Sequence, residues 1–452
     1  MNLLDALFRS EAVETVFSDR TNIQTMLDFE GALARAEARV GVIPSTAAKA
    51  IEAKCRAELF DIGALSEATG PAGNVAFPLV KHLTALVAKK DKEAARFVHW
   101  GATSQDVIDT GRILQIRQAL ELILRDLDSL AEPLGEMAQK HRSTLMAGRT
   151  WMQHALPTTL GVKIAGWLDA IVRHSERLRE TQRRCLVLQF GGAAGTLAAL
   201  GNRGKDVSTF LAAELGLAVP DVPWHSHRDR MAEIAVTLGL CVGTMGKIAR
   251  DISLHMQTEV AEIFEPAEEG RGGSSTMPHK RNPVGCAVVL SAAARVPGLV
   301  STMLTAMVQE DERGLGGWHA EWETLPEIIH LTAGALHHFA AIVPALEIDP
   351  ARMRKNLDLT HGLIFAEAVS MALGEKMGRA QAHELVQAAC VRAEQEKKPL
   401  RAILSGDPRI GTQLTPADLD RLFDARNYLG AADEFVYRVV GTSRAKIPAG
   451  HE

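Results

Sequence analysis

Aromatic residues are scarce in this 452-residue sequence: they make up 5% of it, and only 2 are tyrosines. β-Sheets are enriched in aromatic and β-branched residues. The composition, with its abundant Ala and Leu, therefore argues against a fold built mainly from sheets. The length exceeds the roughly 100–200 residues of one ordinary domain, so two or three domains are expected.

A surplus of charge of either sign is also missing. The 50 basic and 55 acidic residues leave a formal net charge of -5. Because nucleic-acid-binding proteins usually carry a clear basic surplus, no nucleic-acid partner is expected. In a protein that is slightly acidic overall, any site for an anionic ligand must be built locally.

Long apolar runs are interrupted by charges. Asp5, Arg9 and Glu11 break up the N-terminus, where a secretory signal would need an apolar core. The most apolar later segment, 284–308, contains Arg295 and Pro297, which makes it a poor membrane span. We therefore expect a soluble protein with no membrane partner.

The cysteines are few and far apart, and no two form a C-x-x-C pair. This spacing favours reduced core residues in a cytoplasmic protein. The cysteines are Cys55, Cys185, Cys241, Cys286 and Cys390. His225 and His227 form an H-x-H pair, but no cysteine or carboxylate cluster supplies the remaining ligands of a metal site. Because a nicotinamide fingerprint and a phosphate-binding loop are also lacking, no cofactor is expected.

Apolar residues recur at three- and four-residue spacings over much of the chain, which is typical of amphipathic helices. About five long helices are expected between Gly111 and Pro350. They lie within the segments 113–137, 162–188, 231–264, 284–309 and 326–346. The segment 231–264 predicts one helix of more than 30 residues, ended by Pro266.

The parts that flank these helices have more breaks, so we place domain edges near both ends of the bundle. The expected domains are residues 1–111, 112–350 and 351–452. Several of the long helices carry apolar or small residues around most of their circumference, as in 242–246 and 292–294. A helix buried on all sides needs further partners, and the simplest source is other copies of the chain.

Residues 273–283 (GSSTMPHKRNP) join hydroxyl, cationic and amide side chains directly ahead of an apolar helix that starts near Val284. The approach, 265–273, is rich in glycine and charge, so its backbone can move while few apolar groups hold it. Such a segment is either an active-site lid or a mobile surface loop that precedes a helix. The residues alone leave both interpretations open.

Two further blocks accompany this loop: HWGATSQD at 99–106 and GRTWMQHALPTT at 148–159. In this order the three blocks resemble the signatures of the fumarase/aspartase superfamily. Weaker likenesses at 27–33 and 378–384 extend the resemblance over nearly the whole chain. The resemblance implies an all-α, three-domain fold with a central long-helix bundle. It also implies a homotetramer with a twenty-helix core, in which three subunits share each active site.

The same resemblance implies roles for individual residues. Ser274 would be the base that takes a proton from the carbon beside a carboxylate, in an environment to which Lys280 and Asn282 contribute. Ser275 is expected to cap the loop rather than to act in catalysis. His99 is either structural or in contact with substrate. The expected substrate-binding residues are His99, Thr103, Ser104, Thr150, Trp151, Gln153, Ser275, Met277 and Arg313.

Trp151 stands where the superfamily usually has a histidine. An indole N–H donates a hydrogen bond but cannot cycle a proton near neutral pH, which argues against a lyase that expels an amine or a hydroxyl. A substrate carboxylate has a pKa of about 4, so it is ionised at neutral pH and can attack or leave without protonation. Trp151 is then expected to form a wall of the site, and the alternative is a packing residue.

A carboxylate nucleophile corresponds to the cycloisomerase branch of the superfamily. Members of this branch close 3-carboxy-cis,cis-muconate, an unsaturated tricarboxylate, to 4-carboxymuconolactone in the β-ketoadipate pathway of aromatic breakdown. The segments 223–230 (PWHSHRDR) and 312–322 (ERGLGGWHAEW) resemble the same branch. Lys280 and Arg313 are expected to bind substrate carboxylates, Arg313 in a bidentate manner, and Glu312 is expected to orient Arg313.

Two alternatives stay open. The first is an adenylosuccinate-type C–N lyase in which His154, His225 or another histidine supplies the missing acid. The second is a catalytically silent structural homologue. His279 and Arg281 are interpreted as loop or interface residues.

Overall fold

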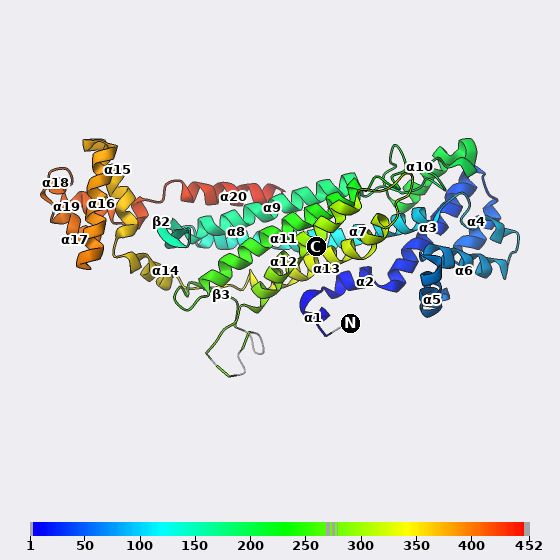
Figure 1. The fold of residues 1–452 in the computed structure, drawn as a ribbon, viewed down its shortest axis with the longest axis horizontal. Coiled ribbons are helices and arrows are strands. Elements are labelled where there is room, and N and C mark those ends of the chain that lie inside the picture. The colour runs from blue at the N-terminus through cyan, green and yellow to red at the C-terminus, as the bar shows by residue number, and fades with distance from the viewer. Residues whose placement is uncertain (1–2, 268–271, 274–275, 278, 447–452) are drawn as a thin grey trace. The chain divides into compact units, whose positions relative to one another are not determined.

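The computed structural model describes residues 3–267, 272–273, 276–277 and 279–446. Ser274 and Ser275 lie outside the described residues. Helices dominate, and the strands within the described part form only two small two-stranded sheets (Figure 1). The predicted all-α fold is confirmed.

The chain forms two compact units, each assembled from three segments. Unit 1 consists of Met1–Asp126, His174–Gly246 and Val288–His338, and unit 2 of Leu127–Arg173, Lys247–Ala287 and Phe339–Glu452. Each long helix contributes residues to both units, because the unit boundaries fall inside the helices. The three-domain division by sequence stays a prediction.

Among the described residues, five helices of more than 20 residues lie between Gly111 and Pro350 or overlap that range, as predicted from the apolar periodicity. They are α7 (Ser104–Ser129), α9 (Leu160–Cys185), α11 (Asp229–His255), α12 (Val284–Ala306) and α13 (Gly317–Ile342). The apolar pattern through residue 137 spans a break, after which α8 (Ala131–Lys140) follows. The expected start of a helix at Val284 is confirmed.

The prediction of one helix from 231 to 264 is wrong, because α11 ends at His255. The chain then turns, with Ala261 at a φ of 51°, and forms strand β3 (Ile263–Phe264). This strand pairs antiparallel with β4 (Glu347–Ile348). The turn buries the carboxylate of Glu262 against partners from other segments, and this polar interaction outweighs the helical periodicity.

Within unit 1, the long helices pack closely against one another. An ideal Cβ on Gly246 of α11 would lie 2.6 Å from the Cβ of Ala293 on α12, so these helices approach as closely as glycine allows. Trp318 of α13 donates its Nε1–H to Asp109 of α7 over 3.0 Å. Part of the small-residue surface that the sequence assigns to other copies is therefore covered within the chain.

The N-terminal part of unit 1 is organised around α3 (Asp19–Val40), whose start is capped by Ser18 and whose end is stopped by Gly41 at a φ of 77°. Most of its inward face is buried apolar surface. The other helices of unit 1 are α1 (Asp5–Phe8), α2 (Glu11–Val16), α4 (Ser45–Glu52), α5 (Ile62–Ala72), α6 (Ala76–Ala88) and α10 (Gly204–Leu215), with 3-10 helices η1 (Ala57–Leu59), η2 (Ala94–Phe97) and η3 (Ala198–Arg203).

Unit 2 contains a β-hairpin that the sequence analysis does not predict, made of β1 (Leu145–Thr150) and β2 (Gln153–Thr159). Its C-terminal helices enclose a separate apolar core that includes Val369, Leu373 and Leu404. The remaining helices are α14 (Pro350–Leu357), α15 (Ala366–Met377), α16 (Arg379–Glu396), α17 (Leu400–Ser405), α18 (Pro408–Gly411), α19 (Pro416–Leu422) and α20 (Ala432–Lys446), with η4 (Asp358–Thr360), η5 (Leu363–Phe365) and η6 (Ala425–Asn427).

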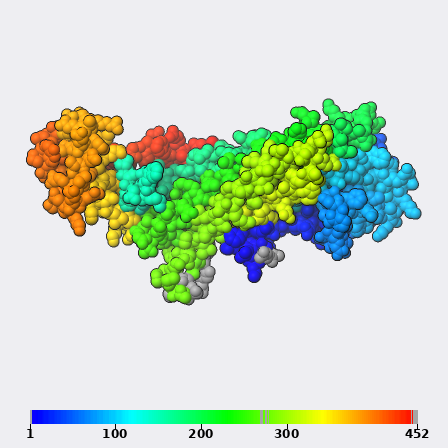
Figure 2. Space-filling view, in the orientation of Figure 1, coloured from blue at the N-terminus to red at the C-terminus, as the bar shows by residue number. Residues whose placement is uncertain are grey.

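All five cysteines are free thiols, as expected, and all but Cys390 are buried. Two helices of the described part, α11 and α12, are long and apolar enough to cross a membrane by length and composition alone. Core helices of soluble proteins meet the same criterion, so this finding is weak evidence for a span. Parts of α12 and α13 lie on the face drawn in Figure 2, in green to yellow.

Candidate active site

Asp106, in the first turn of α7, organises the first sequence block. Its carboxylate is fully buried and accepts hydrogen bonds from His225 Nε2 at 2.7 Å and from the backbone amides of Gly191 and Gly192 at 3.0 and 2.9 Å. It also caps the amide of Thr103 at 3.1 Å. Asp106 thus holds two distant loops against the start of α7.

Thr103 is hydrogen-bonded to Arg313, the arginine expected to bind a substrate carboxylate. Arg313 donates from Nη1 to Thr103 Oγ1 over 3.2 Å and from Nη2 to the carbonyl oxygen of Ala193 over 3.0 Å. The structure therefore brings Thr103 and Arg313 together across 210 residues, with Ser104 next in the chain. Arg313 is oriented by these two oxygens, and within the described part of the chain it forms no hydrogen bond or ion pair with Glu312.

A buried ion-pair cluster supports this region from within unit 1. Arg228 binds Asp109 at 2.6 Å and Glu321 at 2.6 Å. Burial alone would lower the pKa of Arg228, but the two carboxylates raise it further above its ordinary value. The segments 223–230 and 312–322, which the sequence analysis singles out separately, are thus joined by the Arg228–Glu321 pair.

His99 has an unusual backbone and a buried partner. Its φ is 61°, in the left-handed region that non-glycine residues seldom adopt. Its Nδ1 donates to Glu30 Oε1 of α3 over 2.6 Å. Burial would lower the pKa of the His99 imidazole, but the charge and hydrogen bond of Glu30, with the charge of Asp106, raise it above its ordinary value.

The second block, 148–159, covers the end of β1, the turn and all of β2 in the hairpin of unit 2. Thr150 pairs with Gln153, and the two residues between them, Trp151 and Met152, have φ values of 51° and 65°. Two consecutive positive φ angles suit a two-residue hairpin turn but are strained for large side chains. The Trp151 side chain is 97% exposed, so it does not pack within its own chain.

Arg149 anchors the hairpin. It forms a bidentate pair with Glu262 at 3.0 and 2.8 Å, and Glu262 also accepts hydrogen bonds from His255 and Asn356. Burial would raise the pKa of Glu262, but the hydrogen bonds from His255, Arg149 and Asn356 lower it to about 2. This network was missed from sequence, because Glu262 lies within the apolar pattern of a predicted helix.

The third block is described only in part. Asn282 bonds Gly272 twice, its Nδ2 and its backbone amide donating to the same carbonyl oxygen at 3.0 and 2.9 Å. Arg281 pairs with Glu347 at 2.8 Å, and Glu265 accepts from the amides of Gly285 and Cys286 at the start of α12. The base of the loop is therefore anchored, while Met277 and Lys280 are exposed.

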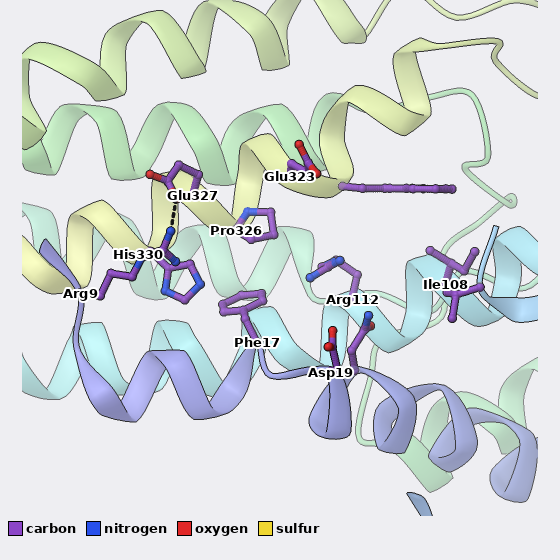
Figure 3. Close-up of a pocket in the computed structure, with 12 residues that line it drawn as sticks. Arg9, Phe17, Asp19, Ile108, Arg112, Glu323, Pro326, Glu327 and His330 are labelled. Atoms are coloured by element: carbon purple, nitrogen blue, oxygen red, sulfur yellow. Dashed lines mark hydrogen bonds and ion pairs between the residues drawn. The ribbon is translucent and has the colours of Figure 1, made fainter. Parts of the chain in front are cut away.

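A cavity within unit 1 lies apart from these residues. It has a volume of about 650 Å³ and is lined by α7, α13 and the N-terminal helices, with Arg9, Phe17, Arg112, Pro326 and His330 around it (Figure 3). No residue of the predicted site lines it. Burial lowers the pKa of Arg112 to about 10, with Asp109 acting in the opposite direction.

The geometry bears on two hypotheses about histidines: a metal site at His225 and His227, and an acid role for His154. His225 is buried and hydrogen-bonded to Asp106, whereas His227 is exposed, so the two side chains do not converge on a common metal position. In the described ranges, no group of three or more His, Cys, Asp or Glu side chains is placed to hold a metal ion. His154 is half-buried, its Nδ1 has no hydrogen-bond partner among the described residues, and burial and Arg149 lower its pKa.

The blocks and the fold define a class of protein. Residues 9–298 match the family described as Lyase, and residues 362–439 match the adenylosuccinate lyase C-terminus. The chain belongs to this lyase family, the fumarase/aspartase superfamily that its three sequence blocks resemble. The resemblance stated from sequence is confirmed.

Within the family, the chain is similar to named enzymes over almost all of its length. It is 57% identical over 443 residues, 98% of this chain and 96% of the relative, to 3-carboxy-cis,cis-muconate cycloisomerase of Pseudomonas aeruginosa. The crystal structure of the 3-carboxy-cis,cis-muconate lactonizing enzyme from Pseudomonas putida matches with a TM-score of 0.92 at 53% identity, covering 98% of this chain and 99% of that one. Nitrosuccinate lyase of Streptomyces davaonensis is 42% identical over 454 residues, covering 99% of this chain and 96% of the relative.

Proposed function

We propose that this enzyme is a cycloisomerase that converts 3-carboxy-cis,cis-muconate to 4-carboxymuconolactone in aromatic breakdown. The similarity to named cycloisomerases covers 98% of the chain. The observation that carries the proposal is Trp151, an indole at the hairpin tip where the superfamily usually has an imidazole. An enzyme that uses a substrate carboxylate as nucleophile needs no proton acceptor at that position.

The reaction joins a carboxylate oxygen of the substrate to one carbon of a double bond and adds a proton to the neighbouring carbon, so the product is an isomer. Arg313 and Lys280 would pair with the remaining carboxylates. Arg313 suits this role because it is exposed and held in place by Thr103 and the Ala193 carbonyl. Lys280 is exposed at the end of the loop.

Ser274 would supply the proton to carbon, and Thr150, Trp151 and Gln153 would line the substrate from the hairpin. Asn282 is proposed to stabilise the developing negative charge. Because its amide nitrogen already bonds the Gly272 carbonyl, this role requires the loop base to rearrange around the substrate.

Product identification in D₂O tests the proposal. Purified enzyme and 3-carboxy-cis,cis-muconate should yield a lactone with one deuterium on carbon, observed by NMR, and Ser274→Ala should lower the rate by at least about 10³-fold while leaving the circular dichroism spectrum unchanged. Lactone formation by the Ser274→Ala variant at the wild-type rate would refute the serine assignment. No reaction with the wild-type enzyme would refute the proposed activity.

A second candidate, a C–N lyase, is favoured by the similarity to nitrosuccinate lyase. In that case His154 or His225 would have to supply the acid. The lowered pKa of half-buried His154 keeps it neutral near pH 7, which makes it a poor proton donor. The Nε2 of His225 already forms a hydrogen bond with Asp106, so it is not available to protonate a leaving group. Release of fumarate from adenylosuccinate would support this candidate, and its absence would exclude the adenylosuccinate-type reaction.

We also propose a cytoplasmic homotetramer in which three subunits contribute to each site. The support is the exposure of Trp151 and Met152 at the hairpin tip and the low burial of α12, of which only 33% of the most apolar window is covered within the chain. A large exposed apolar surface usually marks an interface.

A further inference from the structure

Glu30 is a buried charge that the proposed mechanism does not use. It sits in the middle of α3, only 1% exposed, with Oε1 bonded to His99 Nδ1 at 2.6 Å. Its other oxygen, Oε2, is buried without a hydrogen-bond partner in the described part of the chain. A buried carboxylate that is paired only once costs considerable desolvation free energy, so a function for the pair is expected.

Glu37, two turns further along α3, differs from Glu30 although both are buried carboxyl groups. Neither of its carboxyl oxygens has a hydrogen-bond partner among the described residues. Burial, with a smaller contribution from the charge of Glu30, raises the pKa of Glu37 to about 9. Glu37 is therefore a neutral acid at pH 7.

The groups around His99 favour its cationic form. Glu30 faces it from α3 and Asp106 from α7, and Asp106 is fully buried. The guanidinium group of Arg313 donates a hydrogen bond to the hydroxyl of Thr103. Because Nδ1 is occupied by Glu30, Nε2 is the ring nitrogen left to donate to a ligand, and the side chain is 17% exposed.

We infer that Glu30 is a positioning residue for His99, which it holds as a cation with Nε2–H free to bind a substrate carboxylate beside Thr103 and Arg313. A carboxylate that accepts a hydrogen bond from Nδ1 fixes the direction of the imidazole ring and favours its protonated form. The strained backbone of His99 fits this interpretation, because such strain persists where surrounding contacts enforce it. The catalytic part of the inference rests on the proposed function.

Titration of His99 tests the pair without substrate. NMR with ¹⁵N-labelled histidine, assigned through His99→Gln, should show a His99 pKa above 6.5 in the wild-type enzyme. Glu30→Gln should lower it by at least about one unit, because burial then acts without a compensating charge. Glu37→Gln, an isosteric change on the same helix, should leave it unchanged. A wild-type value at or below 6.5 would overturn the inference, whether or not the Glu30→Gln variant folds.

Kinetics test the catalytic part. In Glu30→Gln the fall of kcat/KM at alkaline pH should begin at least about one pH unit lower than in wild type, so at pH values above both transitions kcat/KM should be about tenfold lower or more. In a His99→Gln background, Glu30→Gln should add little further loss. Superimposable profiles for Glu30→Gln and wild type would overturn the role of Glu30. A wild-type enzyme without turnover would instead refute the proposed function and leave the NMR result valid.

Discussion

At the scale of single residues, Trp151 carries the chemical argument. It is 97% exposed at a hairpin turn, so replacing it should not affect folding. We predict that Trp151→Phe retains cycloisomerase activity within about tenfold of wild type, because the ring persists and no proton passes through the indole. Trp151→Ala should lose about 10²-fold, since the substrate is then less well held. Steady-state kinetics of both variants give the comparison.

These two variants distinguish a Trp151 side chain that only shapes the site from one whose indole N–H takes part in the reaction. If Trp151→Phe were as inactive as Trp151→Ala, the indole N–H would be essential, and a role limited to shape would be wrong. The circular dichroism spectrum should be unchanged in both variants, which serves as the control for folding of the subunit.

The polar contacts of the candidate site were predictable from sequence to different degrees. Arg313 and Thr103 could be proposed from the sequence blocks, and their contact is found in the structure. The Glu30–His99 pair could not, because Glu30 looks like any charge on an amphipathic helix until α3 packs against residue 99. Pairs that form between distant segments leave no local sequence signal.

At the scale of secondary-structure elements, the hairpin depends on Glu262. This carboxylate has a pKa of about 2, against an ordinary value of 4.5, so it stabilises the folded state fully above pH 4.5 and progressively less as the pH falls towards 2. We predict that Glu262→Gln lowers the free energy of unfolding by about 3 kcal/mol at pH 7. The difference should shrink below pH 4.

Urea unfolding of Glu262→Gln and wild type at pH 7 and pH 3 tests this prediction. Equal differences at both pH values would show that the ionised form of Glu262 is not what stabilises the hairpin. Asp424→Asn is a suitable control, because Asp424 pairs with Arg426 at the surface and its loss should not move the unfolding midpoint at pH 7.

The packing of α11 on α12 gives a second prediction at this scale. Alanine favours a helix over glycine by about 1 kcal/mol, yet a Cβ at Gly246 would lie 2.6 Å from the Cβ of Ala293. We predict that Gly246→Ala lowers the thermal midpoint, because the clash costs about 1–3 kcal/mol. Gly441→Ala, in α20 with no atom within 4 Å, should leave the midpoint unchanged or raise it. A raised midpoint in Gly246→Ala would contradict the close approach.

The long helices were predictable because their apolar periodicity persists over many turns, as in α12, whose start at Val284 is confirmed. The end of α11 was not predictable, because it depends on Arg149 and Asn356, two partners of Glu262 that lie 113 and 94 residues away from it in the sequence. The hairpin was not predicted either, since its short strands carry little alternating pattern and end in a turn without glycine.

At the scale of the whole molecule, the central question is whether copies of the chain complete the site. The proposed tetramer predicts a mass of about four times 48.8 kDa by light scattering or native mass spectrometry. It also predicts that mixing two impaired variants, Ser274→Ala and His99→Gln, gives more activity than either variant alone when subunits exchange. An active monomer would contradict the sharing of sites between subunits.

The proposed function depends on which substrate the enzyme turns over. The most direct measurement is the initial rate on 3-carboxy-cis,cis-muconate, followed by loss of the diene absorbance in the presence of a chelator, beside the rate on adenylosuccinate. A cycloisomerase should remove the diene rapidly without added metal or nucleotide and should release no fumarate from adenylosuccinate. An intact diene together with released fumarate would contradict the proposed function and would mean that another residue replaces the histidine absent at Trp151.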